Sequence, residues 1–397
     1  SRMKWFTMAG AFVVSGAILA GVAWAADETA QNFQIKNRFR VGWDSNVYET
    51  EKDPTDSFKV IEEIEFLVNL DLEQTFLGFR YRPTFVWWDN RNPDDTDFHH
   101  EADVVFSHNF TPRLSLSAKD TLRIAELPEL IDRGTVTREK DDYLYNLLDG
   151  VLGYKLSDPT RVEFGGRYTV LRYDDSSVAE TDDYDIYAAG VTVRHQMQPE
   201  TALSGELRLE NTDYTETDAR GSDSMYLGAG LEQIFSPNLV GSLRGGWQRK
   251  EFTSSDLGSE NSPYADLSLT YLPSPKTRVS GGAGFSMFEA DVFPFASQDR
   301  SLAFLTLSHD LTARVQLFLA ASYQLSTYSA DQTIDEDTGV PAGADGDETI
   351  MQGSARASYM LNRNNYLEAS VQYLDFQSDL RNEFDRTRLE LGWRTQL

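Results

Sequence analysis

The sequence predicts an all-β fold, namely a closed, antiparallel, up-and-down transmembrane β-barrel of about eighteen strands, with sixteen as the alternative count. Three observations support this fold. From Phe33 onward, segments of about ten residues alternate apolar with polar or small side chains. Tight turns alternate with long acidic loops, and an export signal precedes the whole pattern.

The export signal occupies the first 25 residues. Lys4 is followed by an apolar run over residues 6–22, and Ala23-Trp24-Ala25 fits a cleavage site between small residues. A single membrane anchor is the alternative interpretation. We expect residues 26–397 to form one barrel domain, because no later stretch approaches the ~18 consecutive apolar residues of a membrane helix.

The strands of this domain are expected wherever a period of two begins. Leu203, Leu207 and Leu209, for example, alternate with Glu206 and Arg208, which gives one apolar and one polar face. A helical period would scatter these side chains around a cylinder. The predicted strands start near Phe33, Phe58, Thr75, Phe98, Arg113, Tyr143, Arg161, Tyr184, Ala202, Met225, Leu239, Tyr264, Thr277, Leu302, Arg314, Met351, Tyr366 and Arg386.

Every second connection is a tight turn. The predicted turns are at residues 72–74, 111–113, 157–160, 198–200, 236–238, 273–276, 310–312 and 362–364. Four of them contain Pro159, Pro199, Pro237 and Pro275, which repeat at a spacing of about forty residues. Proline lacks a ladder donor, so we expect it in turns and not inside strands.

The other connections are long and acidic. They cover residues 49–57, 89–98, 126–142, 174–185, 210–223, 251–261, 289–299, 329–349 and 375–385, and hold 42 of the 63 acidic residues but only seven basic ones. The formal charge of −27 is therefore concentrated at one end of the molecule. Short turns at one rim and long loops at the other are typical of an outer-membrane barrel, with turns in the periplasm and loops outside the cell.

A soluble β-sandwich or propeller is the structural alternative, and it would have an apolar interior. Here arginines lie in the middle of polar faces. An interfacial aromatic girdle is expected from Trp43, Trp87, Tyr173, Trp247, Tyr323, Tyr373 and Trp393. One residue does not fit, because the parity that directs Leu116 and Leu122 to lipid also directs Asp120 there. A β-bulge at Lys119-Asp120 would correct this.

Parity also predicts which side chains line the lumen. The predicted pore-lining arginines are Arg38, Arg40, Arg80, Arg82, Arg167, Arg194, Arg208, Arg244, Arg278, Arg356, Arg388 and Arg394. Guanidinium groups along a water-filled passage favour anions and bind carboxylates in bidentate fashion. The alternative is that interior carboxylates such as Glu63 and Glu368 neutralise them and stiffen the wall. Arg38 and Arg40 of the first strand should face Arg388 and Arg394 of the last.

Catalysis, metals and cofactors have no clear support in the sequence, and we expect no enzyme, no metal and no cofactor. None of the five histidines has the spacing of a catalytic or metal site. The acidic segment 335–337, with Asp345 and Asp347, could bind Ca²⁺ loosely, but it lacks the ordered spacing of an EF-hand. The strong negative charge disfavours nucleic acid as a partner. The absence of cysteine excludes disulfides and thiolate sites.

Three short motifs give the chain a family resemblance. Residues 42–48, the turn at 236–238 and the final segment 386–393 resemble the putative β-barrel porin type 2 family. The resemblance implies an outer-membrane barrel of the kind associated with exopolysaccharide secretion systems. Its expected partners are outer-membrane lipids, a polysaccharide or small polar solute, and periplasmic export components.

The sequence therefore predicts a passive conduit in the bacterial outer membrane, for an exported exopolysaccharide or another polar or anionic solute. A general small-solute diffusion porin is the first alternative. A membrane-embedded hydrolase and a surface adhesion or anchoring barrel are further alternatives, and neither would need to conduct ions.

Overall fold

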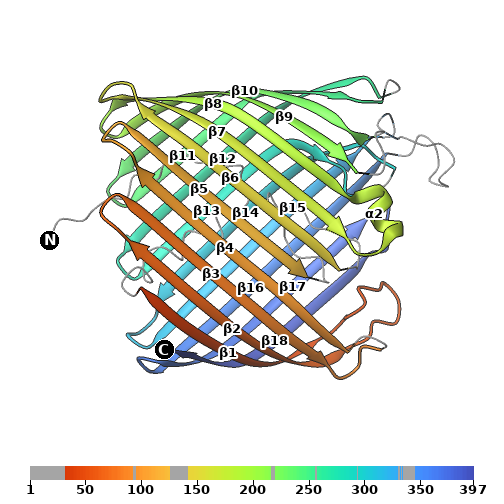
Figure 1. Cartoon of the computed structure of the whole chain (residues 1–397). Helices are drawn as coiled ribbons and strands as arrows, with labels where there is room; N and C mark the ends of the chain where they lie inside the picture. The colour runs from red at the N-terminus through yellow and green to blue at the C-terminus, as the bar shows by residue number, and fades with distance from the viewer. Residues whose placement is uncertain are drawn as a thin grey trace.

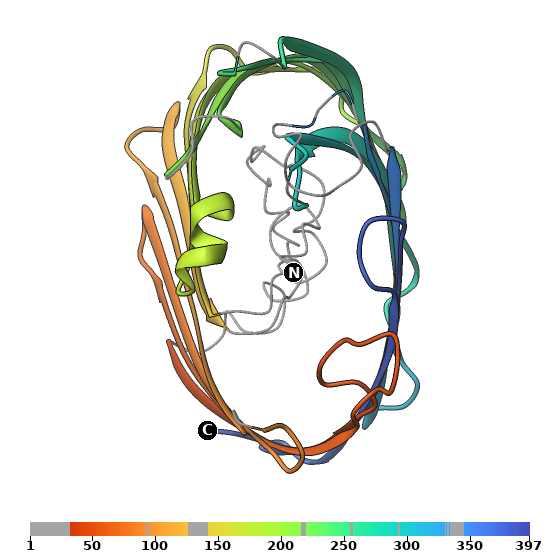
Figure 2. The same cartoon turned by 90° about the vertical axis from the view of Figure 1, so that its right-hand side faces the viewer.

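The computed structural model describes residues 32–92, 95–125, 142–215, 220–254, 257–292, 294–329, 331, 333 and 345–397. They form one antiparallel sheet of eighteen strands, which closes because β1 pairs with both β2 and β18 (Figures 1 and 2). The predicted closed barrel of eighteen strands is confirmed, and the alternative count of sixteen is wrong. The signal peptide expected at residues 1–25 lies outside the described residues.

The strands follow the chain in order around the barrel. They are β1 (Phe33–Asp44), β2 (Ser57–Asp71), β3 (Thr75–Trp88), β4 (Thr96–Asn109), β5 (Leu114–Ala125), β6 (Tyr143–Lys155), β7 (Thr160–Tyr173), β8 (Tyr184–Gln198), β9 (Thr201–Tyr214), β10 (Ser222–Ser236), β11 (Leu239–Phe252), β12 (Ser259–Ser274), β13 (Thr277–Glu289), β14 (Ser297–Asp310), β15 (Val315–Tyr328), β16 (Gly346–Asn362), β17 (Asn365–Ser378) and β18 (Phe384–Gln396).

Four strands begin earlier than the sequence pattern suggests. β10, β12, β14 and β16 start three to five residues before their predicted positions. In each case the early residues continue the ladder into a segment that was assigned to an acidic loop. Backbone pairing does not need apolar side chains, so the ladder extends beyond the apolar band that the sequence pattern reveals.

The connections separate the barrel into a turn end and a loop end. All eight tight turns lie where they were predicted, and the longer connections lie at the opposite end (Figure 1). Both ends of the wall meet at the turn end, where Lys36 of β1 pairs with Gln396 of β18. The connection after β7 contains a short helix, α2 (Ser176–Asp182), that the sequence pattern had assigned to a loop.

Helix α2 shows which face of the wall is interior, because it lies within the ring of strands (Figure 2). Val178 and Ala179 of α2 pack against a buried cluster that contains Tyr145, Leu171 and Tyr173. Alternate residues of β6 and β7 therefore face inward, and the continuous register carries this parity to every other strand. No helix among the described residues is long and apolar enough to cross a membrane.

The outer face carries most of the predicted aromatic girdle. Trp87, Trp247, Tyr323, Tyr373 and Trp393 are outward-facing and exposed, and Trp43 has the same parity. Tyr173 was predicted for this girdle and is wrong. It points inward and is buried against the α2 segment, since a loop that folds back into the barrel gives an interior aromatic residue something to pack on.

Two local predictions about the strands are also wrong. The register of β5 runs without interruption against β4 and β6, so no bulge forms at Lys119-Asp120. Asp120 stays on the outer face and accepts a hydrogen bond of 2.9 Å from Asn146 Nδ2. Proline was also expected only in turns, but Pro83 lies inside β3. The β2–β3 ladder has no residue pair at Pro83.

Candidate functional site: the interior wall

All twelve arginines predicted to line the lumen lie on the interior face of the wall. Their parity follows from the register that links each strand to β6 and β7. Arg167, for example, is opposite Asp149, and Arg38 is opposite Glu63. Both pairs are also ion pairs, at 2.7 Å and 2.8 Å. The wall thus presents rows of fixed guanidinium groups to the inside of the barrel.

Nine of these arginines form ion pairs with interior carboxylates. They are Arg38, Arg40, Arg80, Arg82, Arg167, Arg194, Arg244, Arg388 and Arg394. Most are only partly accessible, which limits the screening of each pair by water. For these nine, the structure agrees with the interpretation in which opposite charges stiffen the wall.

The closure between β18 and β1 carries the densest network. Glu63 accepts from Arg38 at 2.8 Å and from Arg40 at 2.9 Å. Glu368 lies between Arg38 and Arg394, at 3.0 Å and 2.8 Å from their Nε atoms. The predicted opposition across the closure holds for Arg38 and Arg394, which are direct register partners.

The other two arginines predicted at the closure have different register partners. Arg40 is opposite Gly392, and Arg388 is opposite Asp44, to which it is ion-paired at 3.1 Å. A hypothetical Cβ at Gly392 would lie 2.6 Å from the side chain of Arg40. The glycine therefore lets Arg40 lie flat across the wall and reach Glu390 at 2.9 Å.

The sector around this closure has a surplus of positive charge. The interior faces of β16, β17, β18, β1, β2 and β3 hold ten basic side chains and seven carboxylates. The basic ones are Lys36, Arg38, Arg40, Lys59, Arg80, Arg82, Arg356, Arg386, Arg388 and Arg394, and the acidic ones are Asp44, Glu63, Glu65, Asp71, Glu348, Glu368 and Glu390. Counted on these six strands alone, the net charge is +3, whereas the loops are strongly acidic. The carboxylate partners of Arg80 and Arg82 lie on the adjoining β4, and Arg386 also pairs with Glu49.

Three of the twelve arginines make no ion pair with any residue that the structure describes. Arg208 stacks on the ring of Tyr226 at 3.7 Å. Arg278 donates a long hydrogen bond of 3.4 Å to Ser280, and Arg356 lies 5.4 Å from the ring centre of Phe318. These guanidinium groups keep most of their donor capacity for water or solute.

The loop end is narrowed by segments that fold inward, which the sequence did not predict. Arg220 is fully buried and donates to Thr181 O at 2.7 Å, to Asp182 Oδ1 at 3.1 Å and to Ala290 O. It therefore joins the end of α2 to the connection between β13 and β14.

Two further contacts fix these inward segments. Arg381 also holds the β13–β14 connection. It donates to Asp291 O of that connection at 3.2 Å and to Glu348 of β16 at 2.7 Å. Helix α2 is capped by Asp175, whose carboxylate accepts from Ser177, and these hydrogen bonds hold the pKa of Asp175 below its usual range. The loop-end opening is thus shaped by ordered contacts.

The acidic segment that was considered as a Ca²⁺ site lies mostly outside the residues that the structure describes. Residues 335–337 fall outside the described residues, and Asp347 lies at the start of β16. Within the described ranges, no group of three or more His, Asp or Glu side chains is placed to hold a metal ion. Three histidines, at positions 108, 195 and 309, have threonine partners on adjacent strands.

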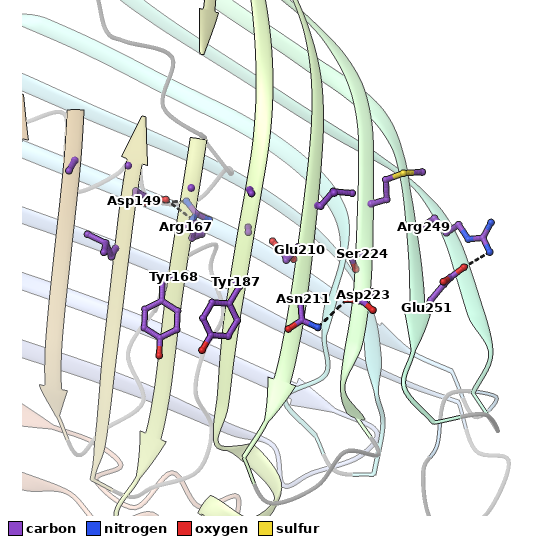
Figure 3. A pocket seen from close by; sticks show the side chains of 18 residues that line it. Asp149, Arg167, Tyr168, Tyr187, Glu210, Asn211, Asp223, Ser224, Arg249 and Glu251 are labelled. Atoms are coloured by element: carbon purple, nitrogen blue, oxygen red, sulfur yellow. Dashed lines mark hydrogen bonds and ion pairs between the residues drawn. The ribbon is translucent and has the colours of Figure 1, made fainter. Parts of the chain in front are cut away.

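A hollow of about 940 Å³ lies on the outside of the wall (Figure 3). Its floor is a cross-strand row of small residues, Ala118, Gly150, Gly166 and Ala189. The labelled Tyr168, Tyr187, Asn211, Asp223, Arg249 and Glu251 have outward parity (Figure 3). This hollow is therefore separate from the passage through the barrel.

Comparison with known proteins gives one family. Residues 32–397 match the family described as "Putative beta-barrel porin 2". No curated protein matches the chain.

Three solved porin structures are similar in outline. OccAB4 of Acinetobacter baumannii is 12% identical, with a TM-score of 0.48, and 92% of this chain and 99% of that one are covered. Pseudomonas aeruginosa OpdK, solved with vanillate, is 11% identical, with a TM-score of 0.49 and the same coverage. OccK2 (OpdF) of Pseudomonas aeruginosa, in complex with glucuronate, is 12% identical, with a TM-score of 0.48 and coverage of 92% and 98%.

Two findings indicate the same class of protein. The wall is a closed barrel of eighteen strands with a charged interior, and the family match covers nearly all of the described chain. The chain belongs to the Putative beta-barrel porin 2 family and is an outer-membrane β-barrel porin.

Proposed function

We propose that the protein is a passive conduit for a polar or anionic solute, and that this solute is an exported exopolysaccharide. The observation that carries the proposal is the net positive sector around the β18–β1 closure, with ten basic side chains against seven carboxylates. Fixed charges on a rigid wall act on every solute that passes them.

The acidic loops and this sector act in opposite directions on an anion. The loop segments hold 42 acidic and seven basic residues, so anions meet a repulsive opening and then a favourable wall. Mobile salt screens the two fields over a Debye length of about 8 Å at physiological ionic strength. A solute that touches the wall is closer to the arginines than this length, so the influence of the wall outlasts that of the loops as salt rises.

The proposed orientation places the turns in the periplasm and the acidic loops outside the cell. Support comes from the position of both wall ends at the turn end and from the length of the opposite connections. A polymer exported in this orientation would enter at the turn end, where periplasmic export components could deliver it.

Two experiments test the proposal. Vesicles that contain the purified full chain should swell faster in a gluconate solution than in a solution of an organic cation of similar size. The counter-ion of that cation should be one that cannot pass the pore. Deletion of the gene should remove the polymer from the cell surface. Vesicles that stay impermeable would contradict the conduit, and a normal amount of surface polymer would contradict the export role.

A general small-solute porin is the second candidate, and one observation favours it. Nine of the twelve interior arginines are neutralised by carboxylates, so most of the wall has no strong preference for one sign of charge. Equal swelling rates for neutral, anionic and cationic solutes of one size would support this alternative.

A further inference from the structure

Two of the three interior arginines that form no ion pair with a described residue, Arg278 and Arg356, lie in one region of the wall. Arg278 of β13, Ser308 of β14, Phe318 of β15 and Arg356 of β16 form one cross-strand row. Neither arginine makes an ion pair with a described residue. Within the described part of the chain, Arg278 donates one long hydrogen bond, of 3.4 Å, to Ser280, and Arg356 lies over Phe318.

The neighbouring row toward the loop end is also free of carboxylates. It consists of Ser280, Thr306, Ala320 and Ser354 in direct register. On the interior faces of these four strands, the described carboxylates lie near the ends. Asp310 ends β14 and accepts from Gln316 at 3.2 Å, and Glu348 is ion-paired to Arg381. Asp310 thus lies one interior row from Arg278 on the turn side, and Glu368 of β17 lies one row from Arg356. Among the described residues, no ion pair joins either carboxylate to Arg278 or Arg356.

The two arginines are close enough to act on one solute. They are three strand spacings apart, or roughly 14 Å between backbones at ~4.8 Å per spacing. An arginine side chain spans about half of that distance, so both guanidinium groups can approach an anion between them. Each can form a bidentate, charge-assisted pair with a carboxylate.

An aromatic ring lies one row further toward the loop end, two interior rows from Arg278 and Ser308. Phe304 of β14 is the register partner of Gly282 and of Ser322. A hypothetical Cβ at Gly282 would lie 2.8 Å from ring atoms of Phe304, so the ring lies against the wall over the glycine. The region thus combines an apolar ring face, several hydroxyl groups and two free guanidinium groups.

These chemical features match a hydroxylated ring that carries a carboxylate. The C–H face of a sugar packs on an aromatic ring, and its hydroxyl groups exchange hydrogen bonds with serine and threonine. Its carboxylate can pair with arginine. A neutral sugar or a simple carboxylate would use only part of the region.

We propose that the interior patch formed by Arg278, Ser308, Phe318, Arg356, Thr306 and Phe304 binds a uronic acid residue. This inference rests on the proposed conduit and names the class of solute that it recognises. Arg278 is the second residue of β13 and Ser308 lies two residues before the end of β14. The patch is therefore at the turn end, where an exported acidic polymer would first contact the wall.

The test is single-channel recording of the full chain in a planar bilayer, with sodium glucuronate added to the turn side. Glucose and acetate are the comparison solutes. We expect glucuronate to interrupt the current more strongly than either. The double variant Arg278→Gln and Arg356→Gln should weaken this block at least tenfold, because the loss of even one charge-assisted hydrogen bond lowers affinity by about that factor.

The matched control is Arg244→Gln, which removes one interior guanidinium from β11, where Arg244 pairs with Glu206 at 3.6 Å. It should weaken the block by no more than about twofold, which is the effect of one charge in the general field of the lumen. Phe304→Ala should weaken the block by glucuronate and by glucose, but not by acetate. Heat-modifiable migration on gels verifies that each variant has folded.

The outcomes separate the two proposals. A parent protein that carries no current contradicts the conduit itself. A conducting channel that glucuronate blocks equally in the parent and the double variant contradicts only the patch. An equal loss of block in the Arg244→Gln control also contradicts the patch, because the effect would then come from the general field of the lumen.

Discussion

Glu63 provides a test of how the interior wall sets ion selectivity. Its carboxylate accepts from both Arg38 and Arg40 at the β18–β1 closure and is buried in the wall. Glu63→Gln keeps the size and one acceptor oxygen of the side chain but removes its charge. The net charge of the sector rises from +3 to +4, so the variant should prefer anions more than the parent does.

The size of this effect follows from the distance between the wall and a passing ion. A unit charge about 5 Å away in water changes the energy of an ion by about 0.8 kcal/mol. Screening at a Debye length of about 8 Å reduces this to about 0.45 kcal/mol. Anions gain and cations lose this energy, so the permeability ratio of anion to cation should rise roughly fivefold.

The measurement is the reversal potential of the reconstituted channel in a salt gradient, near about 0.15 M salt. Arg40→Gln is the matched control, because it removes the opposite charge from the same ion pair, at 2.9 Å. Its ratio should fall by a similar factor. Shifts in the same direction for both variants, or no shift in either, would refute the argument that these fixed charges set selectivity.

Three further predictions concern orientation, the outer face and the loop end. The chain has no cysteine, so a membrane-impermeant maleimide should label Lys52→Cys on intact cells but not Asn238→Cys, and the reverse pattern would overturn the proposed orientation. Asp120→Leu should raise the free energy of unfolding in lipid vesicles by about 1 kcal/mol, because it removes an outward carboxylate from the apolar band. Asp149→Leu should lower that free energy, since it removes the interior carboxylate that pairs with Arg167 at 2.7 Å, and urea titration distinguishes the two results. Arg220→Ala should release the contact between α2 and the β13–β14 connection and increase single-channel conductance, whereas unchanged conductance would mean that these segments do not narrow the passage.

The wall could be predicted from the sequence because its signals are local and repeated. Alternation of side chains marks each strand, and proline or a short polar segment marks each turn. The inward parity of all twelve arginines followed from the same alternation. A single continuous register then extends this parity around the barrel. Register shifts lie beside the turns, as at Ile234 and Ser236, and the β2–β3 ladder is interrupted at Pro83 without a change of register.

The contacts within the site could not be predicted in the same way. Arg38 pairs with Glu368, which is more than three hundred residues away in the sequence, and only barrel closure brings them together. Alternation identifies which face a side chain occupies but not which neighbour it reaches. The distinction between Arg356, which forms no ion pair with a described residue, and Arg394, which pairs with Glu368, therefore required the register of β16, β17 and β18.

Loops were the least predictable part for a related reason. Their sequences are polar, and neither α2 nor the buried position of Arg220 has a periodic signal. Tyr173 was assigned to the outer girdle because aromatic residues at strand ends commonly face lipid. Its burial against the inward loop depends on where that loop folds, which is a tertiary property.

The most direct test of the account is a planar-bilayer recording of the unmodified full chain at low and at high salt. An open conduit with a positive sector inside and acidic loops outside should conduct at both concentrations, and its preference for anions should increase as salt screens the loops. A channel that carries no current, or one whose preference shifts toward cations at high salt, would contradict the account.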